Sequence, residues 1–356
     1  MALEDLFKKA APKWMQAKGP EDDIVIASRV RLARNIANIP FCAVASDEQL
    51  RQVQELVKAV AAQMNLEGSV GTLHFRAMPE VEQLERRRLV EKHLISPQHA
   101  QQVRNRAVAL SDDETLCIMV NEEDHLRIQV LYPGLQLLAA YERADKTDDE
   151  LDARLNFAFS EEVGYLTACP TNVGTGMRAS LMMHLPALSA TGVMPRIINA
   201  VRQLGLTVRG IYGEGTEVVG NIYQVSNQVS LGRSEREIIE HLTNVAEQIL
   251  AHERTARNTL LESNRLALED RIWRAYGVLS HSRILNTADA LGYLSTVRLG
   301  IDLGIITGLE PRILQELMVM IRPAHLQFIM GRELEAEQRD EYRASLIRER
   351  LKQPNG

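Results

Sequence analysis

The sequence predicts a protein of mixed α and β structure, in which a large sheet backed by helices is followed by an all-helical region. Short runs with the apolar or alternating pattern of strands recur between helical segments over the first two thirds of the chain. Beyond Ser234 the strand pattern stops and a helical pattern continues almost to the end. The 356 residues are enough for a sizeable buried core. We therefore expect a mixed domain over residues 1–255 and a helical domain over residues 256–356.

The first long helix is predicted just after Ser46. Ser46 and Gln49 have the spacing of a capping box, in which each side chain bonds the backbone N–H of the other residue. One helical face then carries Leu50, Val53, Leu56, Val57 and Val60. Further helices are predicted over 133–144 and 195–204, and strands over 23–26, 72–75, 116–120, 127–131, 180–185, 207–209 and 218–225.

A second capping box, Ser234 with Glu237, opens the predicted helical region. Its apolar stripe runs through Ile238, Leu242, Val245, Ile249 and Leu250. Breaks in the helical pattern are expected at residues 281–282, at 308–311 and at Pro323.

Composition and charge narrow the class of protein. The formal net charge of −6 argues against a general nucleic-acid binder, and no apolar run is long enough to span a membrane. The first residues interleave charged and apolar side chains and lack the apolar core of a secretory signal. Cys42, Cys117 and Cys169 are spaced too widely for a disulfide framework or a zinc site. We therefore expect a cytoplasmic protein with no membrane partner and no direct nucleic-acid partner.

Two charged segments adjoin predicted strands. Arg29 and Arg31, in the sequence Ser-Arg-Val-Arg, alternate on an extended segment and project to one side, where two guanidinium groups could hold one anion. Taken alone, a solvated basic edge strand explains them better. The sequence Asn-Glu-Glu-Asp-His-Leu-Arg at 121–127 follows an apolar strand. Its carboxylates could grip a guanidinium group or form an ordinary exposed turn.

Two turns contain glycine. Cys169 begins the sequence Cys-Pro-Thr-Asn-Val-Gly-Thr-Gly, where a nearby cation could favour the thiolate; an inert cysteine beside a turn is the alternative. Residues 209–215, Arg-Gly-Ile-Tyr-Gly-Glu-Gly, contain three glycines. They indicate mobility, a close approach of the backbone to a ligand, or only a turn.

In their order along the chain, these four segments resemble blocks of the phosphagen kinases, the family of creatine and arginine kinases. Cys-Pro-Thr-Asn-Val-Gly-Thr matches the family signature, and Ser-Arg-Val-Arg and Asn-Glu-Glu-Asp-His-Leu-Arg match two further blocks. The tract from Gly210 to Ser-Asn-Gln-Val-Ser-Leu-Gly is similar to the flexible loop of the family and the strand after it. The resemblance implies an α+β fold with a large, mainly antiparallel sheet flanked by helices, and ATP-dependent transfer of phosphate to a guanidinium group.

The layout of the chain points to one branch of that family. Small-molecule phosphagen kinases carry a helical domain before Ser-Arg-Val-Arg, which helps to close the substrate pocket; here the block starts at Ser28, so we expect that domain to be missing. A helical domain after residue 255 and the sequence Arg-Asp-Glu-Tyr-Arg-Ala at 339–344 resemble the bacterial protein-arginine kinases of the McsB type. This resemblance covers residues 20–352 and implies phosphorylation of arginine side chains in proteins. The alternative is a kinase of free arginine or another small guanidino compound.

The resemblance also implies the residues of an ATP site. Five arginines would contact the phosphates, which suits planar guanidinium groups that bind phosphate oxygens in pairs. Mg²⁺ is expected to arrive with ATP and to be held mainly by phosphates and water, without a dedicated metal site in the protein. The implied nucleotide-binding residues are Ser28, Arg29, Val30, Arg31, His93, Arg127, Arg178, Ala179, Ser180, Leu181, Met182, Arg209, Gly210, Ile211, Tyr212 and Gly213.

For the acceptor, the resemblance assigns Glu123 and Glu214 to clamp the guanidinium group and take its proton, with Cys169 beside it. It also implies an allosteric phosphoarginine pocket at Arg339, Asp340, Arg343 and Ala344; spacing alone fits an ordinary charged helix face. The implied partners are protein substrates with exposed arginine, an activator protein, a transcriptional repressor, a Clp protease and a second copy of the chain, in bacterial stress response. The residues themselves identify none of these partners.

Overall fold

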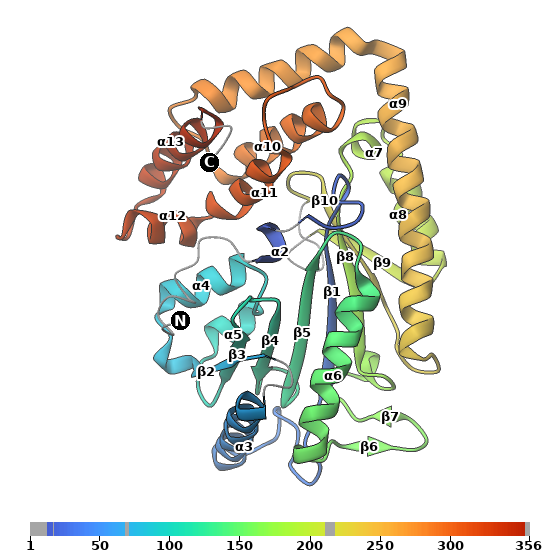
Figure 1. Cartoon of the computed structure of the whole chain (residues 1–356), viewed down its shortest axis with the longest axis vertical. Helices are drawn as coiled ribbons and strands as arrows, with labels where there is room; N and C mark the ends of the chain where they lie inside the picture. The colour runs from blue at the N-terminus through green and yellow to red at the C-terminus, as the bar shows by residue number, and fades with distance from the viewer. Residues whose placement is uncertain (1–12, 17, 68–70, 211–217, 353–356) are drawn as a thin grey trace. The chain divides into compact units, whose positions relative to one another are not determined.

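The computed structural model describes residues 13–16, 18–67, 71–210 and 218–352. Eight strands form one sheet in the order β2-β3-β4-β5-β1-β8-β10-β9 (Figure 1). The pairs β1–β5, β2–β3, β3–β4 and β4–β5 are antiparallel, so the predicted large, mainly antiparallel sheet is confirmed. The strands are β1 (Val25–Arg34), β2 (Leu73–Ala77), β3 (Ala107–Ser111), β4 (Leu116–Val120), β5 (Leu126–Pro133), β8 (Met177–His184), β9 (Leu206–Gly210) and β10 (Ile222–Asn227), with a separate pair β6 (Phe159–Ser160) and β7 (Gly164–Tyr165).

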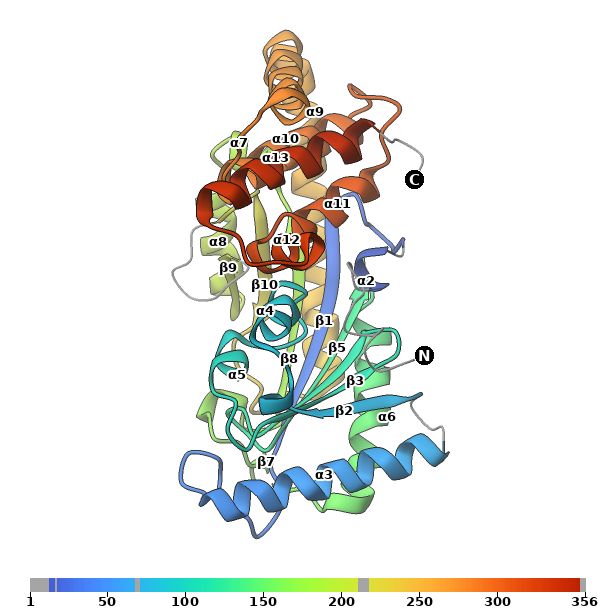
Figure 2. The same cartoon turned by 90° about the vertical axis from the view of Figure 1, so that its left-hand side faces the viewer.

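Helices flank the sheet and make up the C-terminal part of the chain (Figures 1 and 2). No described helix combines the length and the apolar character that crossing a bilayer requires. The α-helices are α2 (Lys13–Gln16), α3 (Asp47–Glu67), α4 (Gln83–Glu91), α5 (Pro97–Gln101), α6 (Leu137–Leu155), α7 (Pro186–Ala190), α8 (Met194–Gln203), α9 (Glu235–His281), α10 (Thr287–Asp302), α11 (Pro311–Met320), α12 (Pro323–Met330) and α13 (Ala336–Lys352); Met78–Glu80 and Pro170–Asn172 are 3₁₀ turns.

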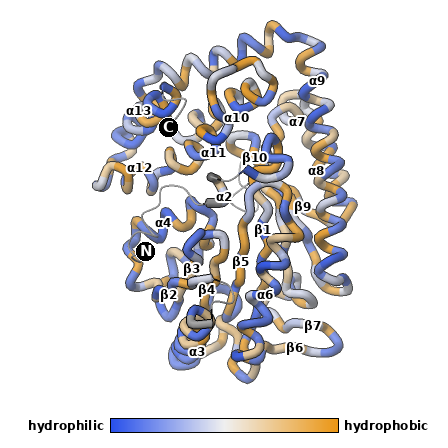
Figure 3. Tube along the Cα trace, in the orientation of Figure 1, coloured by the Kyte–Doolittle hydropathy of each residue, from blue (hydrophilic) through white to orange (hydrophobic). Residues whose placement is uncertain are grey.

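The chain forms two compact units, which we describe separately. The first comprises residues 1–20, 27–181 and 226–243, and the second residues 21–26, 182–225 and 244–356. The first contains β2–β5 and helices α3–α6, and the second contains β9 and helices α10–α13. In Figure 3 strand β5 of the first unit is hydrophobic along most of its length, whereas α9 alternates between hydrophobic and hydrophilic residues.

The register of the first unit decides which side chains share a side of the sheet. Directly paired residues of antiparallel strands point to the same side. Arg31 pairs with Gln129, and Ala33 pairs with Arg127. Arg29 and Arg31 therefore lie on the same side as Arg127, as their alternation in the sequence predicted. The Nε of Arg29 donates to Ser180 Oγ on β8 (3.3 Å), which places Arg178, two residues earlier, on that side too. We call this side, with Arg29, Arg31, Arg127 and Arg178, the arginine face.

The opposite side of β1 packs against α6. Arg34 is 2% exposed there and forms an ion pair with Asp148 of α6 (2.7 Å). Its guanidinium group also donates to the carbonyl of Thr175 (3.0 Å) and lies 3.4 Å from the centre of the Tyr165 ring. A buried guanidinium group is stable only when its donors and its charge are matched in this way. Gly176 leaves room for it, because a Cβ there would lie 2.5 Å from an Arg34 nitrogen.

The structure confirms both helix caps predicted from the sequence. Ser46 and Gln49 bond each other's backbone N–H (2.8 and 3.3 Å), and Ser234 and Glu237 do the same (2.7 and 3.3 Å), so both capping boxes are confirmed. Helix ends at His281 and starts at Pro311 and Pro323 also match the predicted breaks.

Other predicted bounds were wrong. The helix expected from residue 133 begins at Leu137, because β5 continues to Pro133. The strand expected from residue 218 begins at Ile222, since Gly220 and Asn221 have positive φ (66° and 54°), which a strand excludes. Strand β3 was missed. The long helix α9 also breaks at Asn264 (φ −159°), whose side chain accepts from Ala267 N (3.1 Å) and caps a new helix.

Candidate active site

The arginine face concentrates positive charge. Burial foremost, then Arg127 and Arg178, lower the pKa of Arg29 to about 10. Burial, then Arg29, Arg127 and Arg178, lower the pKa of Arg31 well below its usual value, although Glu122 opposes the change. These guanidinium groups are therefore close enough to repel one another, and an anion bound between them would relieve that repulsion.

The donors of this face fit a polyphosphate. Among the described residues, the buried Nε of Arg31 has no hydrogen-bond partner. A buried donor without a partner is costly, and a charge-assisted bond from guanidinium to phosphate is strong. The Arg31 donor therefore points to a ligand with acidic oxygens.

The turn between β4 and β5 supplies carboxylates at the edge of this face. Glu122 is buried; its oxygens lie 2.6 Å from Arg127 Nη2 and accept from Ser96 Oγ (2.5 Å). Burial by itself would raise the pKa of Glu122, but Arg127 and the Ser96 hydroxyl lower it below its usual value. Glu122 thus stays ionised and holds Arg127 in place.

Glu123 is the accessible carboxylate of the turn. Its side chain is 42% exposed and lies 3.3 Å from Arg127 Nη2. Burial raises its pKa, as do Asp124 and Glu122, against the opposing effect of Arg127 and Arg31. A carboxylate with a raised pKa is a better proton acceptor.

Asp124 joins this turn to the cysteine turn. It is buried and accepts from Asn35 Nδ2 (2.7 Å) and from the backbone N–H of Ala168 (2.6 Å). Because Ala168 immediately precedes Cys169, this bond links the acidic turn that carries Glu123 to the cysteine turn. Cys169 is partly exposed, and its Sγ lies 3.0 Å from Thr171 Oγ1.

His93 lies in the segment just after α4 and has a positive φ of 59°. The carbonyls of His93 and Leu94 accept from Gln129 Nε2 (2.9 and 3.1 Å). Since Gln129 pairs with Arg31, these bonds hold the His93 segment over the arginine face. Sequence reasoning missed Gln129, although a polar residue in the middle of an apolar strand was a usable signal.

Several residues predicted to bind the nucleotide lie in β1 and β8, but their side chains do not point to the arginine face. Ser28 is buried on the α6 side, donates to the Gly134 carbonyl (2.7 Å) and accepts from Gln136 N (2.8 Å). Val30 alternates with the arginines, and Ala179 and Leu181 alternate with Ser180; all three are buried. These four side chains do not point to the arginine face, and their assignment to the nucleotide site stays a prediction. Met182 is buried further along β8.

The second unit contains Arg209 and Gly210 at the end of β9; Arg209 is partly exposed and Gly210 is buried. Ile211, Tyr212, Gly213 and Glu214 lie outside the described residues. The assignments of these four residues stay predictions.

The sequence Arg-Asp-Glu-Tyr-Arg-Ala lies in α13. Arg343 is buried; it donates to the carbonyls of Ile321 (2.9 Å) and Leu285 (2.7 Å) and forms an ion pair with Asp340. Ala344 is buried as well. Arg339 and Asp340 are partly exposed, and Arg339 donates to the Leu334 carbonyl (2.7 Å). Arg343 therefore ties helices together within this unit, and the accessible part of the motif is Arg339 with Asp340.

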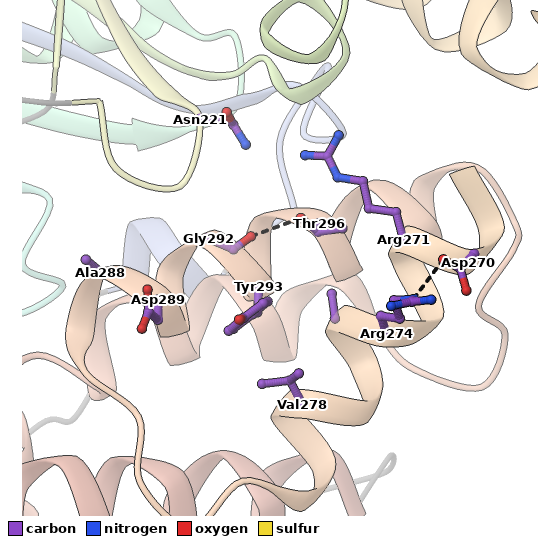
Figure 4. A pocket seen from close by; sticks show the side chains of 11 residues that line it. Asn221, Asp270, Arg271, Arg274, Val278, Ala288, Asp289, Gly292, Tyr293 and Thr296 are labelled. Atoms are coloured by element: carbon purple, nitrogen blue, oxygen red, sulfur yellow. Dashed lines mark hydrogen bonds and ion pairs between the residues drawn. The ribbon is translucent and has the colours of Figure 1, made fainter. Parts of the chain in front are cut away.

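The same unit contains an open cavity of about 920 Å³ (Figure 4). Its lining comes from α9, α10 and the residue before β10, and includes Arg271, Tyr293 and Asn221. None of the site residues predicted from the sequence lines it.

Comparison with known families assigns the chain to a class. The family model for the C-terminal catalytic domain of ATP:guanido phosphotransferases matches residues 52–256, which contain Glu123, Cys169 and three of the predicted phosphate-binding arginines. The model for the C-terminal domain of the protein-arginine kinase McsB matches residues 265–356. The fold, the arginine face and these matches define a phosphotransferase of the ATP:guanido class.

Relatives that match over the full length of the chain identify the family within this class. The chain is 51% identical over 351 residues to a protein-arginine kinase of Halothermothrix orenii, and covers 99% of both chains. It is 51% identical over 354 residues to a protein-arginine kinase of Halalkalibacterium halodurans, covering 99% of this chain and 98% of the relative. The chain belongs to the protein-arginine kinase family.

Solved structures support the fold alone. A lombricine kinase aligns over 71% of this chain and 72% of its own, with a TM-score of 0.59 and 24% identity. A duplicated taurocyamine kinase of Schistosoma mansoni aligns over 72% of this chain and 38% of its own, with a TM-score of 0.59 and 24% identity. At this identity the likeness confirms the phosphagen kinase fold.

We predict opposite effects for two arginines of β1. Arg31→Met should abolish most ATP binding without lowering the free energy of unfolding, because it removes one of several repelling charges. Arg34→Met should lower the free energy of unfolding by about 3–5 kcal/mol, because it leaves Asp148 buried without its partner. Calorimetric ATP titration and urea unfolding would measure both quantities. A large loss of stability in Arg31→Met would show that this arginine, too, is structural.

Proposed function

We propose that this protein transfers the γ-phosphoryl group of ATP to the guanidinium group of arginine side chains in proteins. The observation that carries the proposal is the arginine face with its adjoining carboxylate, Glu123, and Cys169. The chain is similar over its full length to proteins named protein-arginine kinase, which supports protein arginine over free arginine as the acceptor.

The residues of the arginine face would hold ATP. Arg29, Arg31, Arg127 and Arg178 would bind and neutralise its phosphate oxygens, and the strands that carry them fix their places before the ligand arrives. Arg209 would join them, as the family pattern implies. Among the described residues, no group of three His, Cys, Asp or Glu side chains could hold a metal ion. As the family pattern implies, Mg²⁺ would arrive with ATP, bound through its phosphates and water, and would supply further charge neutralisation.

The carboxylates would orient the acceptor. In the proposed reaction a guanidinium nitrogen forms a P–N bond as the bond between the γ-phosphorus and the leaving oxygen of ADP breaks, and one N–H proton is lost. Glu123 would accept that proton and hold the guanidinium group in line, since its pKa is raised and its side chain is accessible. Glu214 would be the second clamp. The Cys169 side chain would lie beside the acceptor without forming a covalent bond to phosphorus.

Arg339 and Asp340 of α13 form a proposed second site for phosphoarginine. Asp340 could accept from its guanidinium group, and Arg339 could bind its phosphoryl group. The ion pair of the buried Arg343 with Asp340 would fix the position of the carboxylate. Ala344, one turn after Asp340 in α13, is buried.

The remaining partners follow from family resemblance. We propose protein substrates with exposed arginine, an activator protein, a transcriptional repressor, a Clp protease and a second copy of the chain, acting in a cytoplasmic stress response. These partners and this setting are predictions of the resemblance.

Glu123→Gln should reduce turnover by about 100-fold or more while ATP binding stays unchanged, because the lost charge acts mostly in the transition state. In the wild type, activity should fall as the pH drops through the raised pKa of Glu123, since the carboxylate must be unprotonated. Steady-state rates between pH 5 and pH 8, with calorimetric ATP titration, would test both statements. Turnover near that of the wild type would remove Glu123 from its proposed role.

Protein arginine should be phosphorylated much faster than free arginine at equal guanidinium concentration. The product should be lost in acid, because protonation of the bridging nitrogen makes it a leaving group. Mass spectrometry under non-acidic conditions, after incubation of a model protein with ATP and Mg²⁺, would detect it, with the Glu123→Gln variant as the matched control. Equal or faster turnover of free arginine would instead favour a kinase of small guanidino compounds.

Arg339→Ala and Asp340→Ala should weaken phosphoarginine binding by at least tenfold each, as expected for the loss of a charge-assisted bond, and should leave ATP affinity unchanged. Arg312→Ala is a suitable control, because Arg312 forms an ordinary exposed i,i+4 pair with Glu316 (2.9 Å). Titration with free phosphoarginine would decide the matter. If both variants bound phosphoarginine as tightly as the control does, the motif would be only a charged helix face.

A further inference from the structure

Gln129 is a buried amide in the middle of an apolar strand. It is 3% exposed and lies between Ile128 and Val130 in β5, both fully buried. A polar side chain in such a place destabilises the fold unless its donors are used. The Nε2 of Gln129 donates to the backbone carbonyls of His93 (2.9 Å) and Leu94 (3.1 Å), which do not belong to any strand. The amide therefore connects the sheet to the segment after α4.

That segment is anchored on both sides of His93. Before it, Lys92 Nζ forms a fully buried ion pair with Glu114 (2.8 Å). After it, Ser96 Oγ donates to Glu122, the carboxylate that holds Arg127. His93 itself has a left-handed backbone (φ 59°), which persists in a residue other than glycine only where the surroundings hold it. The anchors restrict the segment to one conformation.

The strand register places Gln129 within the arginine face. It pairs directly with Arg31 on β1 and stands two residues from Arg127 on the same side of β5. It is a neutral residue among repelling guanidinium groups, and its donors point to carbonyl oxygens rather than to a charge. Through these bonds the position of the His93 segment depends on the strands that carry Arg31 and Arg127.

We infer that Gln129 is a positioning residue for nucleotide binding, which sets the place of His93 relative to the phosphate-binding arginines. The inference rests on the proposed function, because it takes the arginine face as the ATP site. Gln129 acts through the backbone of His93 and Leu94 and does not itself contact the nucleotide. Its loss should therefore weaken ATP binding and leave the chemical step intact.

The first test replaces Gln129 by Met, which has a similar length and no donor. The KM for ATP should rise about tenfold, the size expected when a bonded buried group loses its partner, while kcat at saturating ATP stays within about twofold. Gln327→Met is the matched control. Gln327 is 7% exposed in the helical unit and also donates to a carbonyl, that of Pro323 (3.0 Å). The control should lose stability without changing the KM for ATP.

Two further measurements separate positioning from general stability. Trp14 lies with its ring centre 6.1 Å from that of His93, and Trp273 is the only other tryptophan. In a Trp273→Phe background, Gln129→Met should change the emission of Trp14, and Gln327→Met should not. In a His93→Asn background, where asparagine tolerates the left-handed backbone, Gln129→Met should have little further effect on the KM for ATP.

The outcomes are distinct. An unchanged KM for ATP in a folded Gln129→Met variant, or an equal effect with and without the His93 ring, would overturn the inference. If Gln129→Met does not fold, Gln129→Leu carries the same test. A wild-type protein that binds no ATP would instead contradict the proposed function. ATP binding by the wild type is therefore measured before the variants are compared.

Discussion

Repulsion among the guanidinium groups of one sheet face is the constraint on which the site depends. Arg29, Arg31, Arg127 and Arg178 come from three strands, and burial and mutual repulsion lower the pKa of Arg29 and Arg31. Flexible segments would let such charges move apart, whereas paired strands hold them in fixed register. Guanidinium groups fixed close together favour an anion between them, so this face suits the phosphate oxygens of the proposed ATP ligand.

The acidic turn between β4 and β5 shows how environment divides adjacent carboxylates. Glu122 is buried against Arg127 and the Ser96 hydroxyl, and its pKa is lowered. Asp124 is buried and accepts hydrogen bonds from Asn35 and Ala168, so it joins the acidic turn to the cysteine turn. Only Glu123 is well exposed, and its pKa is raised. Glu122 and Asp124 thus have structural bonds, and Glu123 is the carboxylate available for the proposed proton transfer.

Arginine has two separate uses in this chain. Arg34 and Arg343 are buried, with carboxylates and carbonyl groups as partners, and they connect secondary-structure elements within their own units. Arg31, by contrast, has a buried donor without a partner among the described residues. This donor, together with the neighbouring guanidinium groups that repel one another, supports a ligand site on the arginine face. The bonds of Arg343 connect elements of its own unit, and its part in a phosphoarginine site stays a prediction.

The sequence by itself determined the family, the mixed and helical regions, both capping boxes and the alternation of Arg29 with Arg31, because these depend on local spacing and on ordered motifs. It predicted roles for Glu123 and Cys169 by resemblance alone. Only the tertiary structure showed that the bond from Ala168 to Asp124 links their two turns, and that Ser28 and Val30 point away from the arginine face. Only the tertiary structure showed which groups Gln129 bonds, since strand register and contacts between residues 36 positions apart are not encoded in the local sequence pattern.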